Sequence, residues 1–210
     1  MESQTPQELM RLFQEGDHEA FREIVRRFRD PIISFAARML NDHEKAVDVA
    51  QETFVNVFTH AEGYRPVASF SGWLYRIAYN LAINEIRRRR RHPVVSLDAS
   101  DGPEGDGQPR REARDESPSV EEGLLGDERR AAVRRCVAAL PAKYRGAIVM
   151  KDMEGLTFEE IARILECPES TVKSRVMRAR RMLRKRLEPY LRLGGLEVRH
   201  PRAARQATRS

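Results

Sequence analysis

The stretch LTFEEIARILECPESTVKSRVMRARRMLRKRL, residues 156–187, predicts two helices separated by a short break. Thr157, with Glu160 three residues later, is a capping-box pattern that favours the start of a helix at this point. Pro168 fits only outside a helix or in its first turn, so the first helix should end before it. A short helix, a brief turn and a second helix are typical of the helix-turn-helix.

The second of these helices, residues 170–187, is strongly basic. It contains eight Lys and Arg side chains and no acidic one. Because like charges at this density repel one another, a polyanion is the partner that would relieve the repulsion. An ordinary helical hairpin with a solvated basic face is the alternative. Apolar residues still recur at intervals of three or four, so one face can pack on a core: Val172, Val176, Ala179, Leu183 and Leu187.

The outer face of this helix carries candidate base readers. Glu166 occupies the turn position usually taken by Gly, although it tolerates a left-handed backbone less well. Residues near the start of the second helix reach base edges in the major groove, which here predicts Lys173, Ser174, Met177 and Arg178. The side chains that flank this face are expected to contact phosphates: Arg175, Arg181 and Lys185.

The apolar residues between Pro6 and Arg91 keep helical spacing almost throughout. Pro31 is interpreted as a break between the second and third helices of this block. Asn41 and Asp42 form a capping pair before the next helix, whose apolar face is expected to include Phe58. A block of about 90 residues of this kind can fold as one small domain.

Charge divides the chain into three parts. Residues 92–128 contain eleven acids and three arginines, a net charge of −8, which leaves +14 for the rest of the chain. Residues 93–126 are rich in Gly, Pro and Ser and cannot bury enough apolar surface to offset the entropy of ordering. We therefore predict an all-α protein of two small helical domains, residues 1–92 and 127–191, joined by a flexible acidic linker. Residues 192–210 are expected to form a disordered basic tail.

The segment DVAQETF, residues 48–54, places a polar face on one predicted helix. Asp48, Gln51 and Glu52 share that face at i, i+3 and i+4, while the opposite side is apolar. An acidic patch in a basic protein indicates a protein partner.

The segment SFSGWLYRIAYNLAINEIRRRRR, residues 69–91, places aromatic and amide side chains ahead of five consecutive arginines. Aromatic rings beside a cationic run suit base stacking and phosphate binding, which is the chemistry of single-stranded nucleic acid. Large aromatics are mostly buried, so a core position for Trp73 is equally compatible with the pattern. Besides Trp73, the aromatic, amide and arginine side chains of this segment that fit such a role are Phe70, Tyr75, Tyr79, Asn80, Asn84 and the arginines Arg87 to Arg91.

The sequence argues against catalysis, metal binding and membrane insertion. Its two cysteines form no CxxC motif, its five histidines are scattered, and the pair Asp48 and Glu52 has no His or Ser at usable spacing. No apolar run approaches the roughly 20 residues of a membrane span, and the N-terminus lacks an apolar signal core. We expect a non-enzymatic, cytoplasmic protein without metal or cofactor.

The order of these segments resembles the extracytoplasmic-function (ECF) sigma factors of bacterial RNA polymerase. The resemblance extends over residues 8–190 and rests on DVAQETF, the aromatic and arginine segment, the acidic linker and LPAKYRGAIVMKDMEGLTFEEIARILECPESTVKSRVMRARRML, residues 140–183. It implies that the first domain is region 2, which binds the β′ clamp helices of core polymerase and captures the melted minus-ten strand. The second domain is then region 4, which reads the minus-35 duplex and contacts the β flap.

The resemblance also implies partners and roles for single residues. Promoter DNA, core RNA polymerase and an anti-sigma factor are the expected partners, and the acidic linker would run through the polymerase channels that otherwise carry nucleic acid. Asp48, Gln51 and Glu52 would bind polymerase. The minus-ten strand would be bound by Trp73, Arg76, Asn80, Asn84, Arg87 and Arg88, and the minus-35 element by Lys173, Ser174, Arg175, Met177, Arg178 and Arg181.

Two other classes of function remain open at this point. A helix-turn-helix regulator that binds duplex DNA without polymerase explains residues 156–187 but gives no role to the acidic patch or to the aromatic and arginine segment. A recombinase or nuclease would need a nucleophile or a carboxylate cluster in the first domain, and the sequence offers neither.

Overall fold

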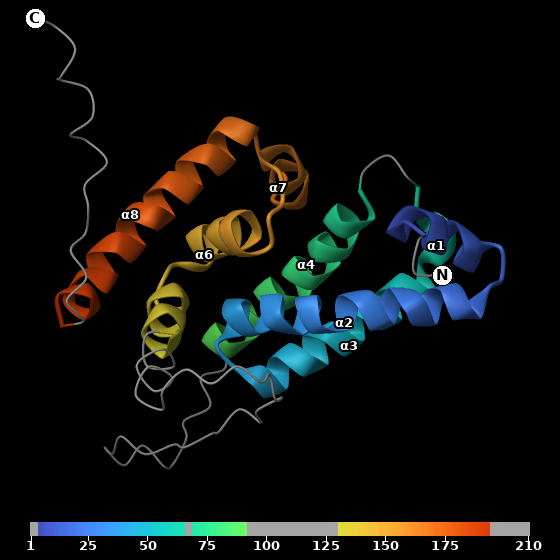
Figure 1. Ribbon diagram of the computed structural model, residues 1–210, viewed down its shortest axis with the longest axis horizontal. Coiled ribbons are helices and arrows are strands. Elements are labelled where there is room, and N and C mark those ends of the chain that lie inside the picture. The colour runs from blue at the N-terminus through green and yellow to red at the C-terminus, as the bar shows by residue number, and fades with distance from the viewer. Residues whose placement is uncertain (1–3, 66–68, 92–129, 194–210) are drawn as a thin grey trace, which may run out of the picture.

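The computed structural model describes residues 4–65, 69–91 and 130–193, and every regular element within those ranges is helical (Figure 1). The expected all-α fold is thereby confirmed. The acidic linker, residues 93–126, lies outside the described residues, as does the tail from residue 194 onward. Residues 192 and 193, which were predicted to belong to the tail, complete the last helix instead.

The first block is a helical bundle built on a fully buried apolar core. Its largest fully buried side chains include Phe35, Phe70, Leu9, Met10 and Ile24. The elements are α1 (Pro6–Gln14), α2 (His18–Leu40), α3 (His43–Thr59), the 3-10 turn η1 (Ala61–Gly63) and α4 (Phe70–Arg91).

Side-chain caps set the boundaries of the first three helices. Thr5 and Glu8 form a capping box at the start of α1, and the Asp17 carboxylate accepts from two backbone amides at the start of α2. Asn41 ends α2 in the left-handed region at φ 53°, and Asp42 begins α3 by accepting from the backbone amide of Lys45. The predicted capping pair is confirmed, and its two members serve two different helices.

The predicted helix break at Pro31 was wrong, because α2 continues through that residue. An interior proline removes one backbone hydrogen bond and costs about 3 kcal/mol. Ile24 before it and Ile32 and Phe35 after it are all fully buried in one core. Each such side chain contributes about 1.5–3 kcal/mol when buried, so packing on both sides outweighs the local cost.

The second block contains the predicted helix-turn-helix. A helical stretch over 130–138 leads to α6 (Ala142–Ile148), the π-helical turn η2 (Val149–Met153), α7 (Phe158–Ile164) and α8 (Glu169–Leu193). Thr157 and Glu160 form the expected capping box at the start of α7. Glu166 adopts the left-handed backbone that its place in the turn demands, with φ 48°. Pro168 directly precedes α8, as predicted.

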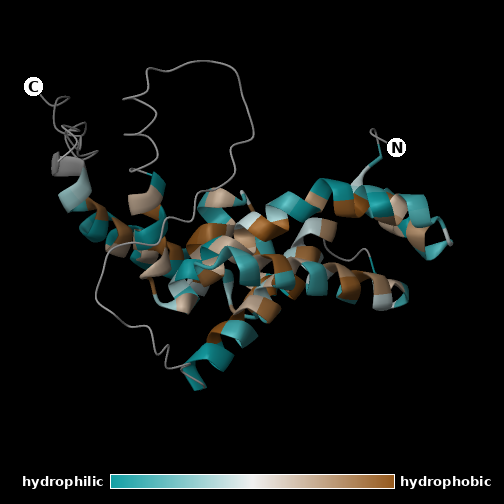
Figure 2. Cartoon of the chain, turned by 90° about the horizontal axis from the view of Figure 1, so that it is seen from below, coloured by the Kyte–Doolittle hydropathy of each residue, from teal (hydrophilic) through white to brown (hydrophobic). Residues whose placement is uncertain are grey.

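The two blocks share one continuous apolar core in this structure. Buried side chains of α2 and α4 belong to the same cluster as buried side chains of α6, α7 and α8. In Figure 2 the hydrophobic stretches gather where the helices crowd together, whereas the outlying helix ends are mostly hydrophilic. The helix that joins the blocks most directly is α4, which packs against α7.

Candidate nucleic-acid and polymerase interfaces

The outer face of α8 presents the predicted base readers to solvent. Lys173, Ser174 and Arg178 are exposed, and Met177 is 71% exposed, a large value for an apolar side chain. The opposite face is buried in the core through Val172, Val176 and Ala179. The two faces therefore divide as the sequence predicted, with packing on one side and a polar, cationic surface on the other.

The charged side chains of α8 differ in how firmly they are held. Arg180 makes a two-pronged ion pair with Asp152 at 2.6 and 2.9 Å, and Lys173 pairs with Glu169 at 2.6 Å. Arg175 is half-buried and lies near Tyr79 of α4. Arg181 is exposed and has no ion-pair partner in the part of the chain that the structure describes.

Two residues of α6 extend the α8 surface, and sequence reasoning missed them. The nearby Arg178 and Lys143 lower the pKa of the Tyr144 hydroxyl. The Lys143 ammonium also lies over the Tyr144 ring, 5.1 Å from its centroid. The only signal available was the basic and aromatic pair Lys143-Tyr144 itself, because the proximity of α6 and α8 is a tertiary feature.

The acidic face of α3 has the predicted geometry. Asp48, Gln51 and Glu52 are exposed on it, and Asp48 also pairs with Lys45 of the same helix at 2.9 Å. The other side of the helix is buried, including Thr53, whose hydroxyl donates to the Val49 carbonyl. The three predicted residues are thus exposed at the surface, where a partner can reach them.

An apolar groove adjoins this acidic face. Its volume is about 530 Å³, and it lies between α2 and α3. Val55 and Phe58 are 62% and 50% exposed, so the prediction that Phe58 faces the core was wrong. Helical periodicity identifies an apolar face but not what covers it, which is why the groove was missed. Its lining includes Phe21, Val25, Arg29, Ile33, Gln51, Phe54, Val55 and Phe58.

The aromatic side chains of α4 divide between core and surface. Phe70 is fully buried and Tyr75 is 6% exposed, so both are core residues and cannot stack on a base in this arrangement. Trp73 is half-buried, with its ring 4.9 Å from that of Tyr64. Asn80 and Asn84 are exposed, as strand capture requires.

The arginines of α4 are partly paired within the protein. Arg88 pairs with Glu85 at 2.7 Å, while Arg89 pairs with Glu85 and with Asp42, each at 2.8 Å. The hydrogen bond from Arg88, helped by Arg89, lowers the pKa of Glu85 to about 2. Arg87 is exposed at the same end of the helix. Arg76, one helical turn after Trp73, pairs with Glu166 of the second block at 2.5 Å.

The structure brings two predicted sites to the walls of one hollow. This hollow, about 560 Å³ in volume, has Asp48 and Glu52 of α3 on one side and Asn84 and Arg88 of α4 on the other. Residues predicted to bind polymerase and residues predicted to bind the minus-ten strand are therefore neighbours. The α8 residues lie in the other block, so the predicted sites form two surfaces.

Neither a cluster of metal-ligand side chains nor a membrane-spanning helix occurs among the described residues. They contain no group of three or more His, Cys, Asp or Glu side chains placed to hold a metal ion. Among them, no helix combines the length and apolar character that crossing a bilayer requires.

Both blocks match known sequence families. Residues 24–92 match the family described as Sigma-70 region 2, and residues 130–183 match Sigma-70, region 4. The chain is 37% identical over 189 residues to the RNA polymerase sigma-H factor of Pseudomonas aeruginosa, which covers 89% of this chain and 95% of that protein. It is 34% identical over 194 residues to the ECF RNA polymerase sigma-E factor of Escherichia coli, covering 91% and 98%.

Solved structures share the fold. One is the sigma factor RpoE in complex with the anti-sigma factor NepR from Bartonella quintana, with a TM-score of 0.60 and 24% identity over 80% of this chain and 96% of that one. Another is CnrH in complex with the cytosolic domain of CnrY, with a TM-score of 0.61 and 24% identity over 86% and 96%. At this level of identity the likeness concerns the fold.

Proposed function

Because this chain belongs to the ECF sigma factors of the sigma-70 family, we propose that α3 docks on core RNA polymerase, α4 captures the minus-ten strand and α8 reads the minus-35 duplex. The chain directs promoter-specific initiation, as its family does, and is not a stand-alone regulator. Sigma factors are initiation factors rather than catalysts, and we assign this chain no catalytic step of its own.

The polymerase-binding surface that we propose combines charge and apolar area. Asp48, Gln51 and Glu52 provide the polar part, and the groove beside Gln51, with Val55 and Phe58 on its rim, provides the apolar part. An apolar patch beside polar residues is typical of a protein docking site. We assign this surface to the β′ clamp helices, and we expect the second domain to contact the β flap.

The minus-ten surface that we propose lies on the exposed side of α4. Asn80 and Asn84, which are exposed, would hydrogen-bond unpaired bases, and the half-buried ring of Trp73 would stack on one. Arg76, Arg87 and Arg88 are cationic groups of the same helix that would bind the strand's phosphates.

The minus-35 surface that we propose is the exposed face of α8, extended by Tyr144. Ser174, Met177 and Arg178 would reach base edges, with the Tyr144 hydroxyl near Arg178. Lys173 lies beside them, and Arg175 and Arg181 would contact phosphates. The observation that carries this proposal is the exposure of these readers on a helix whose opposite face is fully buried.

The proposed division of the chain is residues 1–92 as region 2, 93–126 as the acidic linker, 127–191 as region 4, and a basic tail. We propose that the protein acts in the cytoplasm, where core polymerase and promoter DNA are found. One solved neighbour, RpoE, is bound to the anti-sigma factor NepR, and another, CnrH, is bound to the cytosolic domain of CnrY. We propose that this chain also has an inhibitory anti-sigma partner.

Run-off transcription with purified core polymerase and a genomic promoter library tests this function. We expect promoter-specific transcripts only when the chain is added. Specific duplex binding that is equally tight without polymerase, together with no initiation, would favour a stand-alone regulator instead.

A further inference from the structure

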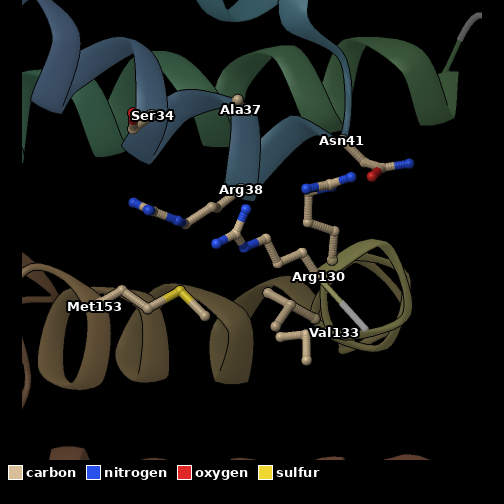
Figure 3. A pocket seen from close by; sticks show the side chains of 9 residues that line it. Ser34, Ala37, Arg38, Asn41, Arg130, Val133 and Met153 are labelled. Atoms are coloured by element: carbon tan, nitrogen blue, oxygen red, sulfur yellow. The ribbon is translucent and has the colours of Figure 1, made fainter. Parts of the chain in front are cut away.

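A cavity between the two blocks belongs to none of the surfaces proposed above. It has a volume of about 560 Å³ and lies between α2 and the helical stretch 130–138, with Met153 of η2 also on its wall. Figure 3 shows Arg38 of α2 on one side of this space and Arg130, Val133 and Met153 on the other. The proposed polymerase and DNA surfaces lie on α3, α4 and α8, so the cavity is separate from them. Its lining residues are Ser34, Ala37, Arg38, Asn41, Arg130, Val133, Arg134, Val137 and Met153.

Part of the cavity wall is apolar. Val133 and Met153 are 38% and 37% exposed, which places both among the few large hydrophobic side chains that the described residues leave at the surface. They come from different elements and meet at this one cavity, together with Ala37 and Val137. A concave apolar surface in contact with water is stabilised when another apolar group covers it.

The rest of the wall is cationic and polar. Arg38, Arg130 and Arg134 line the cavity, and no acidic side chain is among the lining residues that the structure describes. Ser34 and Asn41, both exposed, add a hydroxyl and an amide. Guanidinium groups gathered around one space repel one another, and an anion placed between them relieves that repulsion.

Arg38 shows that a guanidinium of this wall can bind a carboxylate. It donates through Nη1 to Oε1 of Glu154 at 2.7 Å, and the Tyr75 hydroxyl donates to the other oxygen of the same carboxylate at 2.7 Å. An arginine has five N–H donors, so one such contact does not exhaust it. The Arg38 side chain is 37% exposed and lies on the cavity wall, where its other donors are available to a second anion.

The size and the chemistry of the cavity together define a class of ligand. Small-molecule sites typically have volumes of about 300–1,000 Å³ and mostly apolar walls, with a few charged or polar groups that fix the orientation of the ligand. Guanidinium groups bind carboxylate and phosphate oxygens through paired hydrogen bonds. A purely apolar ligand would leave the arginines without an anion, and a bare inorganic anion would leave Val133 and Met153 uncovered. A ligand with an anionic head and an apolar body satisfies both parts of the wall.

We propose that this cavity is a binding site for a small amphipathic anion, namely a carboxylate or a phosphate monoester with an apolar tail. The head group contacts the three arginines, and the tail covers Val133 and Met153. The ligand binds the folded chain and therefore stabilises it. The site does not depend on the function proposed above.

Calorimetric titration of the full-length chain tests the site with matched probes. Decanoate and decyl phosphate carry both parts of the ligand, decanol lacks the charge, and inorganic phosphate lacks the tail. We expect saturable binding of decanoate, decyl phosphate or both, and binding of the other two that is weaker by about tenfold or more. The comparison of the two amphiphiles identifies the preferred head group. The proposal is overturned if neither amphiphile binds saturably below its micelle concentration, or if decanol or inorganic phosphate binds as tightly as the better amphiphile.

Arg134 and Arg135 provide a matched pair of variants. Both are exposed on the same helical stretch, and of the two it is Arg134 that lines the cavity. Because Arg134→Ala and Arg135→Ala change the net charge equally, they separate binding in the cavity from general attraction to a basic protein. We expect Arg134→Ala to weaken binding of the better amphiphile about tenfold and Arg135→Ala to leave it unchanged. An equal effect of the two substitutions would count against the site.

The acidic linker of the chain itself is the competing occupant, because it closely precedes Arg130 in the sequence. A chain in which residues 98–122 are replaced by a neutral Gly/Ser segment distinguishes the two occupants. We expect this chain to bind the amphiphile with an affinity similar to that of the parent. Binding by the neutral-linker chain with none by the parent would assign the cavity to the linker and overturn the proposal.

Methyl NMR locates the ligand without relying on a substitution. When the methionine methyl groups are isotope-labelled, Met153 reports on the cavity, and Met177, which is 71% exposed on the cationic helix α8, reports on non-specific binding. We expect the Met153 signal to shift when the amphiphile is added and the Met177 signal to stay in place. A shift of the Met177 signal alone would show that the amphiphile binds the basic helix, and the cavity would be excluded as its site.

Discussion

Arg178 and Arg181 lie on the same helix, but their surroundings differ. Arg178 lies near the Tyr144 hydroxyl, whereas Arg181 is exposed with no ion-pair partner among the described residues. Arg178, nearer the start of the helix, suits base recognition, and Arg181, further along it, suits phosphate contact.

The first prediction concerns these two arginines. Arg178→Ala should cost about 1–3 kcal/mol at one base position of the minus-35 element, because a bidentate contact to that base is lost. Arg181→Ala should weaken binding to all sequences and make the affinity for duplex DNA less dependent on salt concentration. Duplex binding measured across single-base variants and salt concentrations distinguishes the two effects. Equal weakening of every sequence by Arg178→Ala would make it a phosphate contact and move base reading to Lys173, Ser174 or Met177.

Glu166 shows what sequence alone can and cannot decide at one residue. Its position in the motif predicted a turn that favours glycine, and the left-handed φ of 48° confirms the turn. Its ion pair with Arg76 joins segments 90 positions apart in the chain, and no local pattern reports such a pair. The exposure of Phe58 was missed for the same reason, because spacing does not reveal which neighbours are present.

At the scale of the element, α3 has one face for the core and one for a partner. The second prediction is that Asp48→Arg or Glu52→Arg abolishes association with core polymerase while the circular dichroism spectrum stays unchanged. Reversing a charge that faces a partner introduces repulsion, and both side chains are exposed on the free protein. Glu62→Arg, an exposed residue in η1 outside this surface, is the matched control and should co-purify normally. Undiminished co-purification of the α3 variants would contradict the assignment.

The third prediction follows from the lowered pKa of Glu85 in α4. A carboxylate whose pKa is about 2 in the folded state and roughly 4.3 when unfolded stabilises the fold above the unfolded value. That stability is lost as the pH falls from about 5 toward 2, because the group becomes protonated and its pairs with Arg88 and Arg89 weaken. Urea unfolding should show the parent to be more stable than Glu85→Gln near neutral pH, with the difference shrinking across this range. If the difference in unfolding free energy does not change with pH, the pairs that Arg88 and Arg89 form with Glu85 do not stabilise the fold through its charge.

Helix boundaries were predictable from the sequence where residues next to the boundary set them. They were less predictable where tertiary packing sets them. The side chains of Thr157 and Asp42 accept from neighbouring backbone amides, and Asn41 adopts the left-handed backbone that ends a helix, so all three mark helix boundaries as expected. Pro31 has an equally clear local preference, yet the core on both sides keeps α2 continuous through it. The hydroxyl of the buried Tyr75 donates to Glu154, which lies in another block of the chain and which no local pattern could connect to it.

At the scale of the whole molecule, the acidic linker between the blocks carries the fourth prediction. Replacing residues 98–122 with a neutral Gly/Ser segment of equal length should impair initiation more than it impairs minus-35 duplex binding. The reason is that a polyanionic segment suits the basic polymerase channels, whereas α8 needs no linker to bind DNA. Run-off transcription and duplex binding of the same variant provide the comparison. Unaltered initiation would show that the segment serves as a tether.

The arrangement of the two blocks could not be predicted from the sequence. Composition and charge separated two helical blocks from an acidic segment, and motif order indicated the family. The contacts of Arg145, Glu154 and Gly146 across the blocks are decided by tertiary packing, and no repeat or periodicity reports them.

The central claim is that one chain recognises duplex DNA through α8 and unpaired DNA through α4. The most direct measurement is the permanganate reactivity of minus-ten thymines in complexes of core polymerase with Asn80→Ala and Asn84→Ala chains, beside minus-35 duplex binding by the same chains. The account predicts that duplex binding is unchanged while thymine reactivity falls, because α4 no longer holds the open strand. Promoter opening equal to that of the parent chain would contradict it.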